Sequence, residues 1–351
     1  MKLEASVRYV RWRSPLRAAH ATDVRTAPPP RPLVLVRLES ADGAVGHGEA
    51  APLADYDGVT LEQVSDALRA YEPVCATGAG LSHSELLANC AARAPLPQAL
   101  AAIDLALWDL AGQRAGQPIW QLLGSQAPPI VELNAAIGAE DPGLAATRAR
   151  EAVERGLGCI KVKVGVGDDV ARVRAVRSAV GPGVRLRLDA NGAWLLDQAI
   201  ETLATLVEHD IELCEEPVHG VFGIAAVARA LPYLTIAADE TGADPTLFKA
   251  RVCASVCLKI SRCGGITGVL RDAVAARNAG YDVYLASTLD GPLGIAAALH
   301  VAAVVEPVRP CGLATLDRFV APEVLPISGG RLAPPPGSGL GDRLAGWYDS
   351  L

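Results

Sequence analysis

The chain has 351 residues, half of them hydrophobic, and a net charge of −7. This length predicts a large folding unit together with a smaller one. The acidic balance and the lack of a basic tract argue against nucleic acid or an anionic membrane surface as a partner. No apolar run is long enough to span a bilayer and the N-terminus lacks a signal-peptide core, so we expect a cytoplasmic protein.

The cysteines agree with that compartment. The chain has eight, and most lie in or beside apolar stretches. Cys253 and Cys257 have no second pair or histidine at a spacing that would bind zinc. We therefore expect buried, reduced thiols without a disulfide framework.

Residues 1–125 are predicted to form an α+β domain. Strand-like patterns cover residues 2–13, 33–39 and the stretch after a turn at 41–44. Apolar residues at helical spacing predict helices over 60–71 and 96–116. The loop at 14–32 holds consecutive prolines, which cannot complete a sheet, so we expect it to be mobile.

From residue 126 to 318, short apolar runs alternate with stretches long enough for helices. Each run ends in an ionisable side chain, and these ends recur at intervals of about 20–26 residues. Buried parallel strands read as apolar runs, and their crossovers are usually helices. The repeat predicts a (β/α) barrel, whose strand C-termini carry the chemistry. The ionisable ends are Lys161, Lys163, Asp189, Glu215, Asp239 and Lys259.

The remaining elements of the barrel follow from the same pattern. Its first strand is expected at Ile130–Asn134 and its last near 310–315. Residues 319–351 are rich in proline and glycine and are expected to pack back on the first domain. The expected helices are 142–156, 168–180, 197–209, 222–231, 244–252, 267–279 and 294–305.

Three carboxylates end three consecutive strands: Asp189, Glu215 and Asp239. Strand alternation turns Glu215, and not Glu216, into the barrel mouth. Any one of these acids could merely neutralise a lysine, but unpaired buried carboxylates are costly, and three together favour a shared cation. An all-oxygen site suits Mg²⁺, with Mn²⁺ as a substitute.

Lysines flank this predicted metal site. Lys161 and Lys163 are two residues apart on one strand and point to the same face. Their mutual repulsion and a nearby metal would lower their pKa values, and a neutral lysine is a general base. Lys259 approaches from the opposite side. The chemistry that fits is removal of a proton α to a carboxylate, with the resulting anion stabilised by the metal.

Seven short motifs follow one another over nearly the whole chain: Gly48–Leu53, Ala101–Leu110, Lys161–Lys163, Asp189–Trp194, Glu215–Pro217, Ala238–Glu240 and Lys259–Gly265. In this order they resemble the enolase superfamily, and specifically its muconate-lactonizing subgroup. The resemblance implies a modified (β/α)₇β barrel under an N-terminal α+β capping domain that the C-terminal segment completes.

The resemblance also implies roles for individual residues. Asp189, Glu215 and Asp239 become Mg²⁺ ligands, Lys163 the base and Lys259 the opposing lysine. Lys161 becomes the electrostatic partner of Lys163, and Asn191 and Glu240 support the site from behind. Relatives are often multimers, so the resemblance allows a homo-oligomer.

The substrate is predicted to be a small carboxylate, and four reactions share this arrangement of lysines. They are dehydration by o-succinylbenzoate synthase, muconate cycloisomerisation, dipeptide epimerisation and N-acylamino acid racemisation. Dipeptide epimerases usually carry Asp-x-Asp at the eighth strand, whereas Cys311–Thr315 has no acid.

That stretch and Ala286–Gly294 are similar to an o-succinylbenzoate synthase, which is the leading expectation. Ser287, with backbone N–H groups at Gly312 and Leu313, would then bind the succinyl carboxylate of the substrate. Arg17 or Arg25, both in the N-terminal loop, would close over an anionic substrate. Racemase, epimerase and cycloisomerase activities stay open as alternatives.

Overall fold

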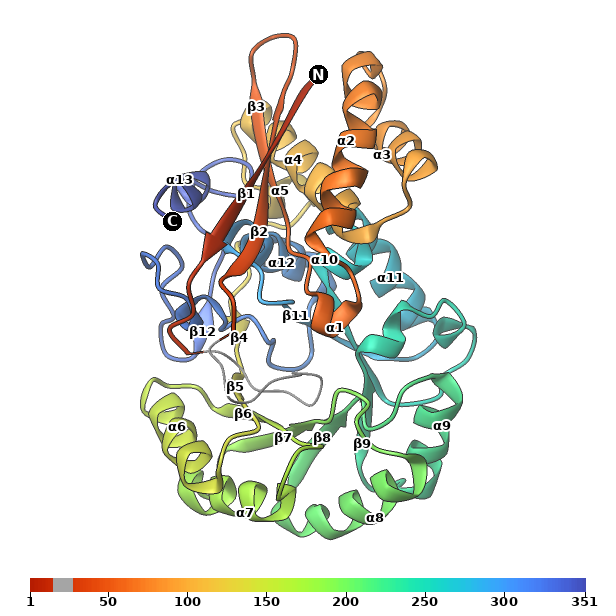
Figure 1. Ribbon diagram of the computed structural model, residues 1–351, viewed down its shortest axis with the longest axis vertical. Coiled ribbons are helices and arrows are strands. Elements are labelled where there is room, and N and C mark those ends of the chain that lie inside the picture. Colours follow the sequence, from red (N-terminus) through yellow and green to blue (C-terminus); the bar gives the residue numbers. More distant parts are fainter. Residues whose placement is uncertain (15–27) are drawn as a thin grey trace.

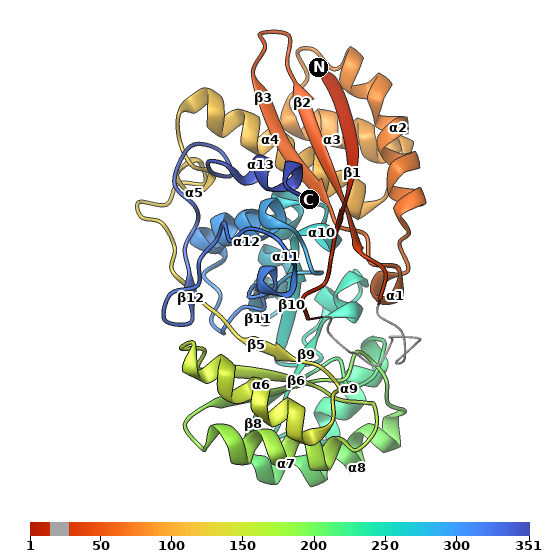
Figure 2. The ribbon, with the colours of Figure 1, turned by 60° about the vertical axis from the view of Figure 1, so that its left-hand side comes forward.

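The computed structural model describes residues 1–14 and 28–351 (Figure 1). The expected loop, with Arg17 and Arg25, lies mostly outside the described residues. An α+β domain formed by the first third of the chain lies above a barrel of strands and helices in this view. The turned view in Figure 2 shows the C-terminal segment running along the side of both parts.

The upper domain is a three-stranded antiparallel meander covered by helices on one face. The strands are β1 (Lys2–Val10), β2 (Arg31–Glu39) and β3 (Val45–Ala50). The helices are α1 (Ala54–Asp57), α2 (Leu61–Thr77), α3 (His83–Arg93), α4 (Pro97–Ala115) and α5 (Ile119–Leu122). The expected helices at 60–71 and 96–116 are confirmed, and the first begins with the Thr60 hydroxyl accepting from Gln63 N.

Two glycines on one face of β3 allow it to pack directly on α4. A Cβ at Gly46 would lie 2.0 Å from Ala106 O, and one at Gly48 would lie 1.9 Å from Ala102 O. The glycines are two apart on a strand and the alanines four apart on a helix, so both pairs meet in register. The sequence therefore brings strand and helix backbones closer together than side chains would permit.

The lower domain contains a seven-stranded sheet in the order β11-β10-β9-β8-β7-β6-β5. Its strands are β5 (Ala135–Ile137), β6 (Cys159–Lys163), β7 (Arg185–Asp189), β8 (Ile211–Glu215), β9 (Thr235–Ala238), β10 (Ser255–Lys259) and β11 (Asp282–Ala286). Every neighbouring pair is parallel. Parallel bridges from Cys311 to Leu133 and from Gly312 to Ala286 place residues 311–312 between the two edge strands and close the barrel.

Helices follow the strands, as expected of a (β/α) barrel. They are α6 (Pro142–Glu154), α7 (Asp169–Val180), α8 (Leu196–Leu206), α9 (Val221–Ala230), α10 (Ile260–Cys263), α11 (Ile266–Asn278) and α12 (Pro292–Val305). Short 3₁₀ turns lie at Val207–His209 (η1), Glu240–Ala243 (η2), Leu247–Lys249 (η3) and Leu316–Arg318 (η4).

Two expectations about these elements are wrong. Residues 244–252 form only the single turn η3, because Pro245 and the short distance between β9 and β10 leave no room for a full helix. The first barrel strand begins at Ala135 and not at Ile130. The segment before it, β4 (Val131–Glu132), pairs instead with β12 (Arg331–Leu332) of the C-terminal segment.

The C-terminal segment contacts the upper domain, as expected. It ends in helix α13 (Leu344–Asp349), where the Tyr348 hydroxyl donates to the Glu49 carboxylate at the end of β3. Arg8 of β1 donates to Tyr348 O at 3.0 Å. Phe319 forms a bridge with Trp12. These contacts make the capping domain one body with the end of the chain.

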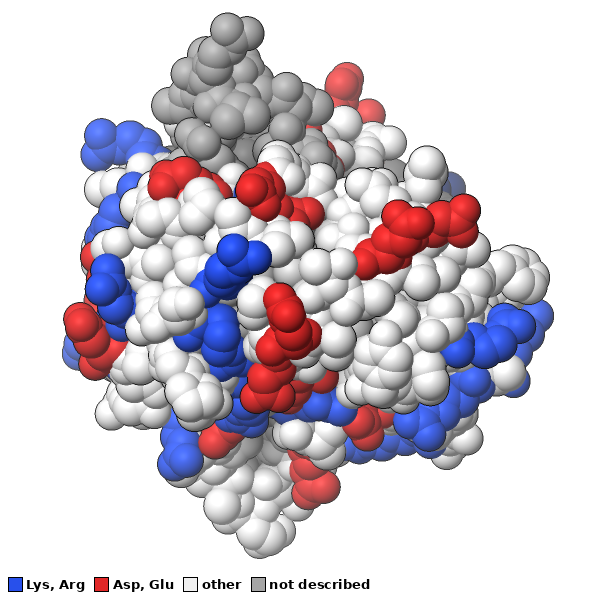
Figure 3. Space-filling view, turned by 90° about the horizontal axis from the view of Figure 1, so that it is seen from below, with Lys and Arg blue, Asp and Glu red and all other residues white. Residues whose placement is uncertain are grey.

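The cysteines are free, and all but Cys263 are buried. Within residues 1–14 and 28–351, no helix is long and apolar enough to cross a membrane. On the face in Figure 3, both acidic and basic side chains lie among uncharged ones.

The contact between β3 and α4 yields a stability prediction. Gly48→Ala should lower the free energy of unfolding by about 1–3 kcal/mol, because the added methyl group would overlap the α4 backbone. Thermal unfolding measures this change. Gly183→Ala is the matched control, since a Cβ there meets nothing within 4 Å and should have a much smaller effect. Equal effects of the two substitutions would contradict the account of this packing.

Candidate active site

The C-terminal ends of five neighbouring strands bring six ionisable side chains together. Lys161 and Lys163 are on β6, Asp189 ends β7, Glu215 ends β8, Asp239 follows β9 and Lys259 ends β10. The parallel register pairs Lys163 with Asp189 and Asp189 with Glu215. All six side chains are buried. The ends of strands that are far apart in the sequence therefore form one cluster.

The two lysines of β6 share the Asp189 carboxylate, and each has a second partner of its own. Lys161 Nζ lies 2.8 Å from Asp189 Oδ2 and 2.9 Å from Glu215 Oε1. Lys163 Nζ donates to Asp189 Oδ2 and to Asn191 Oδ1, both at 2.6 Å. Asn191 Nδ2 in turn donates to Glu240 Oε1 at 2.9 Å. A chain of hydrogen bonds therefore runs from Lys163 through Asn191 to Glu240.

Glu215 faces the cluster and Glu216 faces away from it, as alternation predicts. Tyr284 of β11 donates to Glu215 Oε2 across the barrel at 2.6 Å. Glu216 instead accepts from the backbone of Asp239 at 2.8 Å and from Thr241 N at 3.1 Å. Its role is to fix the turn that carries Asp239.

The lysine pKa values were expected to be lowered by mutual repulsion and a nearby metal, but without an ion the pKa of Lys161 is shifted in the opposite direction. Burial lowers the pKa of Lys161, but the charges of Asp189 and Glu215 outweigh burial and raise it well above its usual range. Burial likewise opposes the charge of Lys259, yet Asp239 raises the pKa of Lys259. The sequence pattern placed like charges side by side, but it did not show that each lysine touches a carboxylate.

Glu215 and Asp239 lie close enough together to share one cation. One oxygen of each lies within 4.8 Å of the other and of the Cys257 sulfur. Burial, opposed by Lys161, raises the pKa of Glu215 to about 7. Burial raises the pKa of the Cys257 thiol as well, so it stays protonated and leaves the carboxylates as the donors. Such hard oxygen donors fit Mg²⁺ or Mn²⁺ better than zinc.

A second observation supports the fit of a cation. Asp239 Oδ1 is buried and accepts no hydrogen bond from the described part of the chain. Asp189, the third expected ligand, has both oxygens engaged, Oδ2 with the two lysines and Oδ1 with Asn191 N at 3.1 Å. Asp189, Glu215 and Asp239 would hold a metal ion here, and the ion would give a closer partner to Asp239 Oδ1, which lies 3.7 Å from Arg262 Nη1.

Lys259 approaches the same pocket from the other flank. Its Nζ lies 2.5 Å from Asp239 Oδ2, and it also donates to the Tyr56 hydroxyl. The Tyr56 ring centroid is 4.2 Å from that Nζ. Arg262 donates to the same hydroxyl at 3.0 Å. Tyr56 belongs to α1 of the capping domain, and the sequence analysis missed it because only the fold brings α1 over the barrel.

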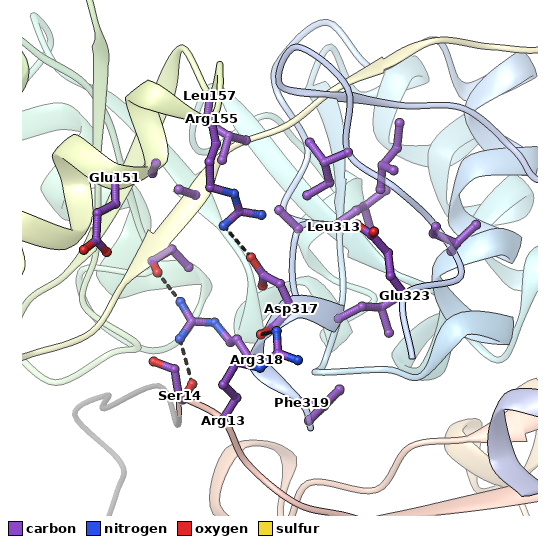
Figure 4. Close-up of a pocket in the computed structure, with 18 of the residues that line it drawn as sticks. Arg13, Ser14, Glu151, Arg155, Leu157, Leu313, Asp317, Arg318, Phe319 and Glu323 are labelled. Carbon is purple, nitrogen blue, oxygen red and sulfur yellow. Dashed lines mark hydrogen bonds and ion pairs between the residues drawn. The ribbon is translucent and has the colours of Figure 1, made fainter. Parts of the chain in front are cut away.

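One pocket joins these flanks. It is lined by Lys161, Lys163, Asp189, Lys259, Ser287 and Gly312, together with Leu53, Tyr56, Asn134, Ala136, Ala286, Thr288, Leu289, Ala314 and Thr315. Ser287 and Gly312, which were expected to contact the substrate, line this pocket. Leu313 is not among these lining residues. Its side chain faces a neighbouring cavity, where Asp317 pairs with Arg155 at 2.7 Å (Figure 4).

A buried arginine fastens the capping domain to the loop that forms one wall of this pocket. Arg31, at the start of β2, donates to Ala51 O and to Thr288 O, both at 3.0 Å. It also donates to Leu289 O at 3.3 Å. Leu289 has a φ of 59°, a backbone conformation that leucine seldom adopts without such support. The wall formed by residues 287–289 is therefore held from the capping side.

Two family models match the chain. Residues 2–124 match the family described as mandelate racemase / muconate lactonizing enzyme, N-terminal domain, and residues 144–346 match the family described as enolase C-terminal domain-like. The chain belongs to the enolase superfamily. Its enzymatic nature and its capped-barrel fold follow from that membership, and the resemblance seen in the sequence motifs is confirmed at this level.

Similar members of the superfamily include both isomerases and a lyase. A hydrophobic dipeptide epimerase of Enterococcus faecalis is 33% identical over 311 residues, 84% of this chain and 85% of that protein. An o-succinylbenzoate synthase of Thermobifida fusca is 36% identical over 209 residues, 55% of this chain and 63% of that protein. The crystal structure of a dipeptide epimerase from Cytophaga hutchinsonii, complexed with Mg and the dipeptide D-Ala-L-Val, has a TM-score of 0.88 at 28% identity and covers 99% of this chain and 98% of that one.

The close approach of the buried Glu215 and Asp239 carboxylates predicts that a divalent ion stabilises this enolase-superfamily chain. After chelation, Mg²⁺ at a hundredfold excess over its Kd should raise the free energy of unfolding by about 2.7 kcal/mol. Glu215→Gln and Asp239→Asn should remove most of that gain, because each deletes a charged oxygen donor. Thermal unfolding with and without Mg²⁺ measures the difference.

The control for that experiment is Asp244→Asn, at an exposed aspartate outside the cluster. It should keep the full Mg²⁺-dependent gain. A gain that survives Asp239→Asn would show that the ion binds elsewhere.

Proposed function

We propose that the protein is a Mg²⁺-dependent racemase or epimerase that inverts the α-carbon of an N-acylated α-amino acid, such as a dipeptide. The observation that carries this proposal is the pair of lysines, Lys163 and Lys259, which line one pocket from strands that three others separate. Inversion requires one group to remove a proton from one face of a carbon and another to deliver a proton to the opposite face. The similarity to dipeptide epimerases supports the same choice.

Each lysine would alternate between base and acid. In one direction neutral Lys163 takes the α-proton, while the Lys259 ammonium delivers a proton to the other face; in the reverse direction the roles exchange. Asp189 and Asn191 orient the Nζ of Lys163. Asp239 and Tyr56 orient the Nζ of Lys259.

Lys161 would act differently from the other two lysines. It bridges Asp189 and Glu215, and its raised pKa keeps it charged beside them. It would thus supply fixed positive charge to the substrate carboxylate. A divalent ion held by Asp189, Glu215 and Asp239 would add further stabilisation of the negative charge that develops on that carboxylate.

A dehydrating lyase is the second candidate. The similarity to an o-succinylbenzoate synthase favours it, as does the stretch Cys311–Thr315, which carries no carboxylate. The nearest acid, Asp317, pairs with Arg155 in the neighbouring cavity. Dehydration needs only one lysine to move protons, so the two candidates differ in what the loss of Lys259 does to proton transfer.

Proton exchange with D₂O tests the proposal. The wild-type protein with Mg²⁺ should incorporate deuterium at the α-carbon of both enantiomers of a substrate, as followed by proton NMR. Lys163→Ala should abolish inversion and stop exchange of one enantiomer, and Lys259→Ala should stop exchange of the other. The expected loss for each is at least about a hundredfold, the usual contribution of a general base.

A control variant and two contrary outcomes complete this test. Lys249→Ala, at an exposed lysine outside the pocket, should leave exchange unchanged. Exchange of a single enantiomer by the wild-type protein, with elimination of water from a hydroxylated substrate, would favour the lyase. Wild-type rates in Lys163→Ala would contradict the assignment of the base.

A further inference from the structure

The half of the barrel mouth opposite the carboxylates is neutral and polar. It is formed by the start of β5, the end of β11 and residues 312–315, which lie beside one another in the closed barrel. The polar side chains that line the pocket from these elements and the residues adjoining them are Asn134, Ser287, Thr288 and Thr315. Ser287 Oγ lies 2.9 Å from Thr315 Oγ1.

Asn134 has an unused hydrogen-bond donor in this half. The residue is only 3% exposed, and within residues 1–14 and 28–351 nothing accepts a hydrogen bond from its Nδ2. Its backbone is fixed, since Asn134 N donates to Cys311 O at 3.0 Å. A buried amide donor without an acceptor costs free energy, so its presence in a binding pocket points to an acceptor that a ligand brings.

The neighbouring glycine keeps the space beside this amide open. A Cβ on Gly312 would lie 3.0 Å from Ala286 Cβ and 3.7 Å from Asn134 Oδ1. Ala136, two residues after Asn134 on the same face, adds only a methyl group. Small side chains on three sides therefore allow a ligand group to reach the floor of the pocket.

The charges around the pocket say which kind of ligand group fits. Among the described residues that line it, Asp189 is the one carboxylate, and it is already bound to two lysines. A substrate carboxylate fits on the side of the lysines and of the residues that would hold a metal ion. The substituent on the other side of the α-carbon then meets a neutral wall, which would leave a free ammonium there without a partner.

We propose that Asn134 is a specificity-determining residue whose Nδ2 donates a hydrogen bond to the carbonyl oxygen of the acyl group on the substrate's α-nitrogen. Ser287 and Thr315 complete the neutral wall around that group. This inference rests on the proposed function, because it takes the α-carbon to lie between Lys163 and Lys259. It adds the residue by which the pocket distinguishes an acylated nitrogen from a free one.

A thermodynamic cycle, in which the residue at position 134 and the acceptor atom of the ligand are each changed, tests this contact. The ligands are the N-acetyl and N-thioacetyl forms of one amino acid, which have the same charge and nearly the same shape but differ in the strength of the acceptor. Their Kd values are measured by calorimetry with Mg²⁺ on the wild-type protein, Asn134→Ala, Asn134→Asp and the control Asn89→Ala, at an exposed asparagine of α3. Deuterium exchange at the α-carbon is recorded on the same samples.

The wild-type protein and Asn89→Ala should prefer the oxygen ligand by about tenfold, the value of one hydrogen bond. Asn134→Ala should reduce that preference to less than about twofold. Asn134→Asp, which keeps the shape but replaces the donor with an acceptor, should bind the oxygen ligand no better than Asn134→Ala.

The two readouts separate the two ideas. Exchange by the wild-type protein together with an unchanged oxygen preference in both Asn134 variants would overturn the contact and leave the proposed function standing. A preference that depends on Asn134, without exchange of any ligand, would uphold the contact and overturn the racemase or epimerase. Failure of the wild-type protein to bind either ligand would overturn both.

Discussion

Six ionisable side chains buried at one end of a barrel must neutralise one another, and this constraint organises the molecule. Three carboxylates face three lysines, but the pairing is uneven: Asp189 contacts two lysines, whereas Asp239 keeps an oxygen without a donor. Burying a charged side chain costs desolvation free energy, and here the opposite charges of neighbouring side chains offset that cost. The chain has only five lysines, and three of them are here. Arginine, which cannot deprotonate near neutral pH, supplies most positive charge elsewhere.

The capping domain does more than cover the barrel mouth, because it contributes side chains that contact the charged cluster and the pocket wall. Tyr56 accepts from Lys259 and Arg262, so the electrostatic surroundings of one lysine include a side chain from the other domain. Arg31 binds carbonyl groups on both sides of the domain boundary. Such contacts require a rigid capping domain, and the close packing of β3 on α4 at Gly48 provides that rigidity. Stability of the cap and geometry of the pocket are therefore linked.

Short-range patterns predicted the strand ends well, because alternation and repeat length fix where a charged residue at the end of an apolar run must point. Lys161, Asp189 and Glu215 were found in this way. The helix expected at 244–252 failed, since Pro245 and a short connection outweigh local propensity. The pKa of Lys161 and the unused donor of Asn134 depend on contacts between strands far apart in the chain, and no local pattern of residues contains that information.

The mouth of the barrel thus has two halves with different physical demands. The charged half is constrained by mutual neutralisation, so a single substitution there leaves a buried charge unpaired, and its chemistry is hard to change. The neutral half is held by backbone bridges at Cys311 and Gly312 and by hydroxyl and amide groups, whose exchange costs far less. Under the proposed function, the charged half would move the proton, and the residues around Asn134 and Ser287 would decide which substituent fits beside it. For this chain, the unsatisfied amide on the neutral side makes a ligand carbonyl the group that the pocket lacks.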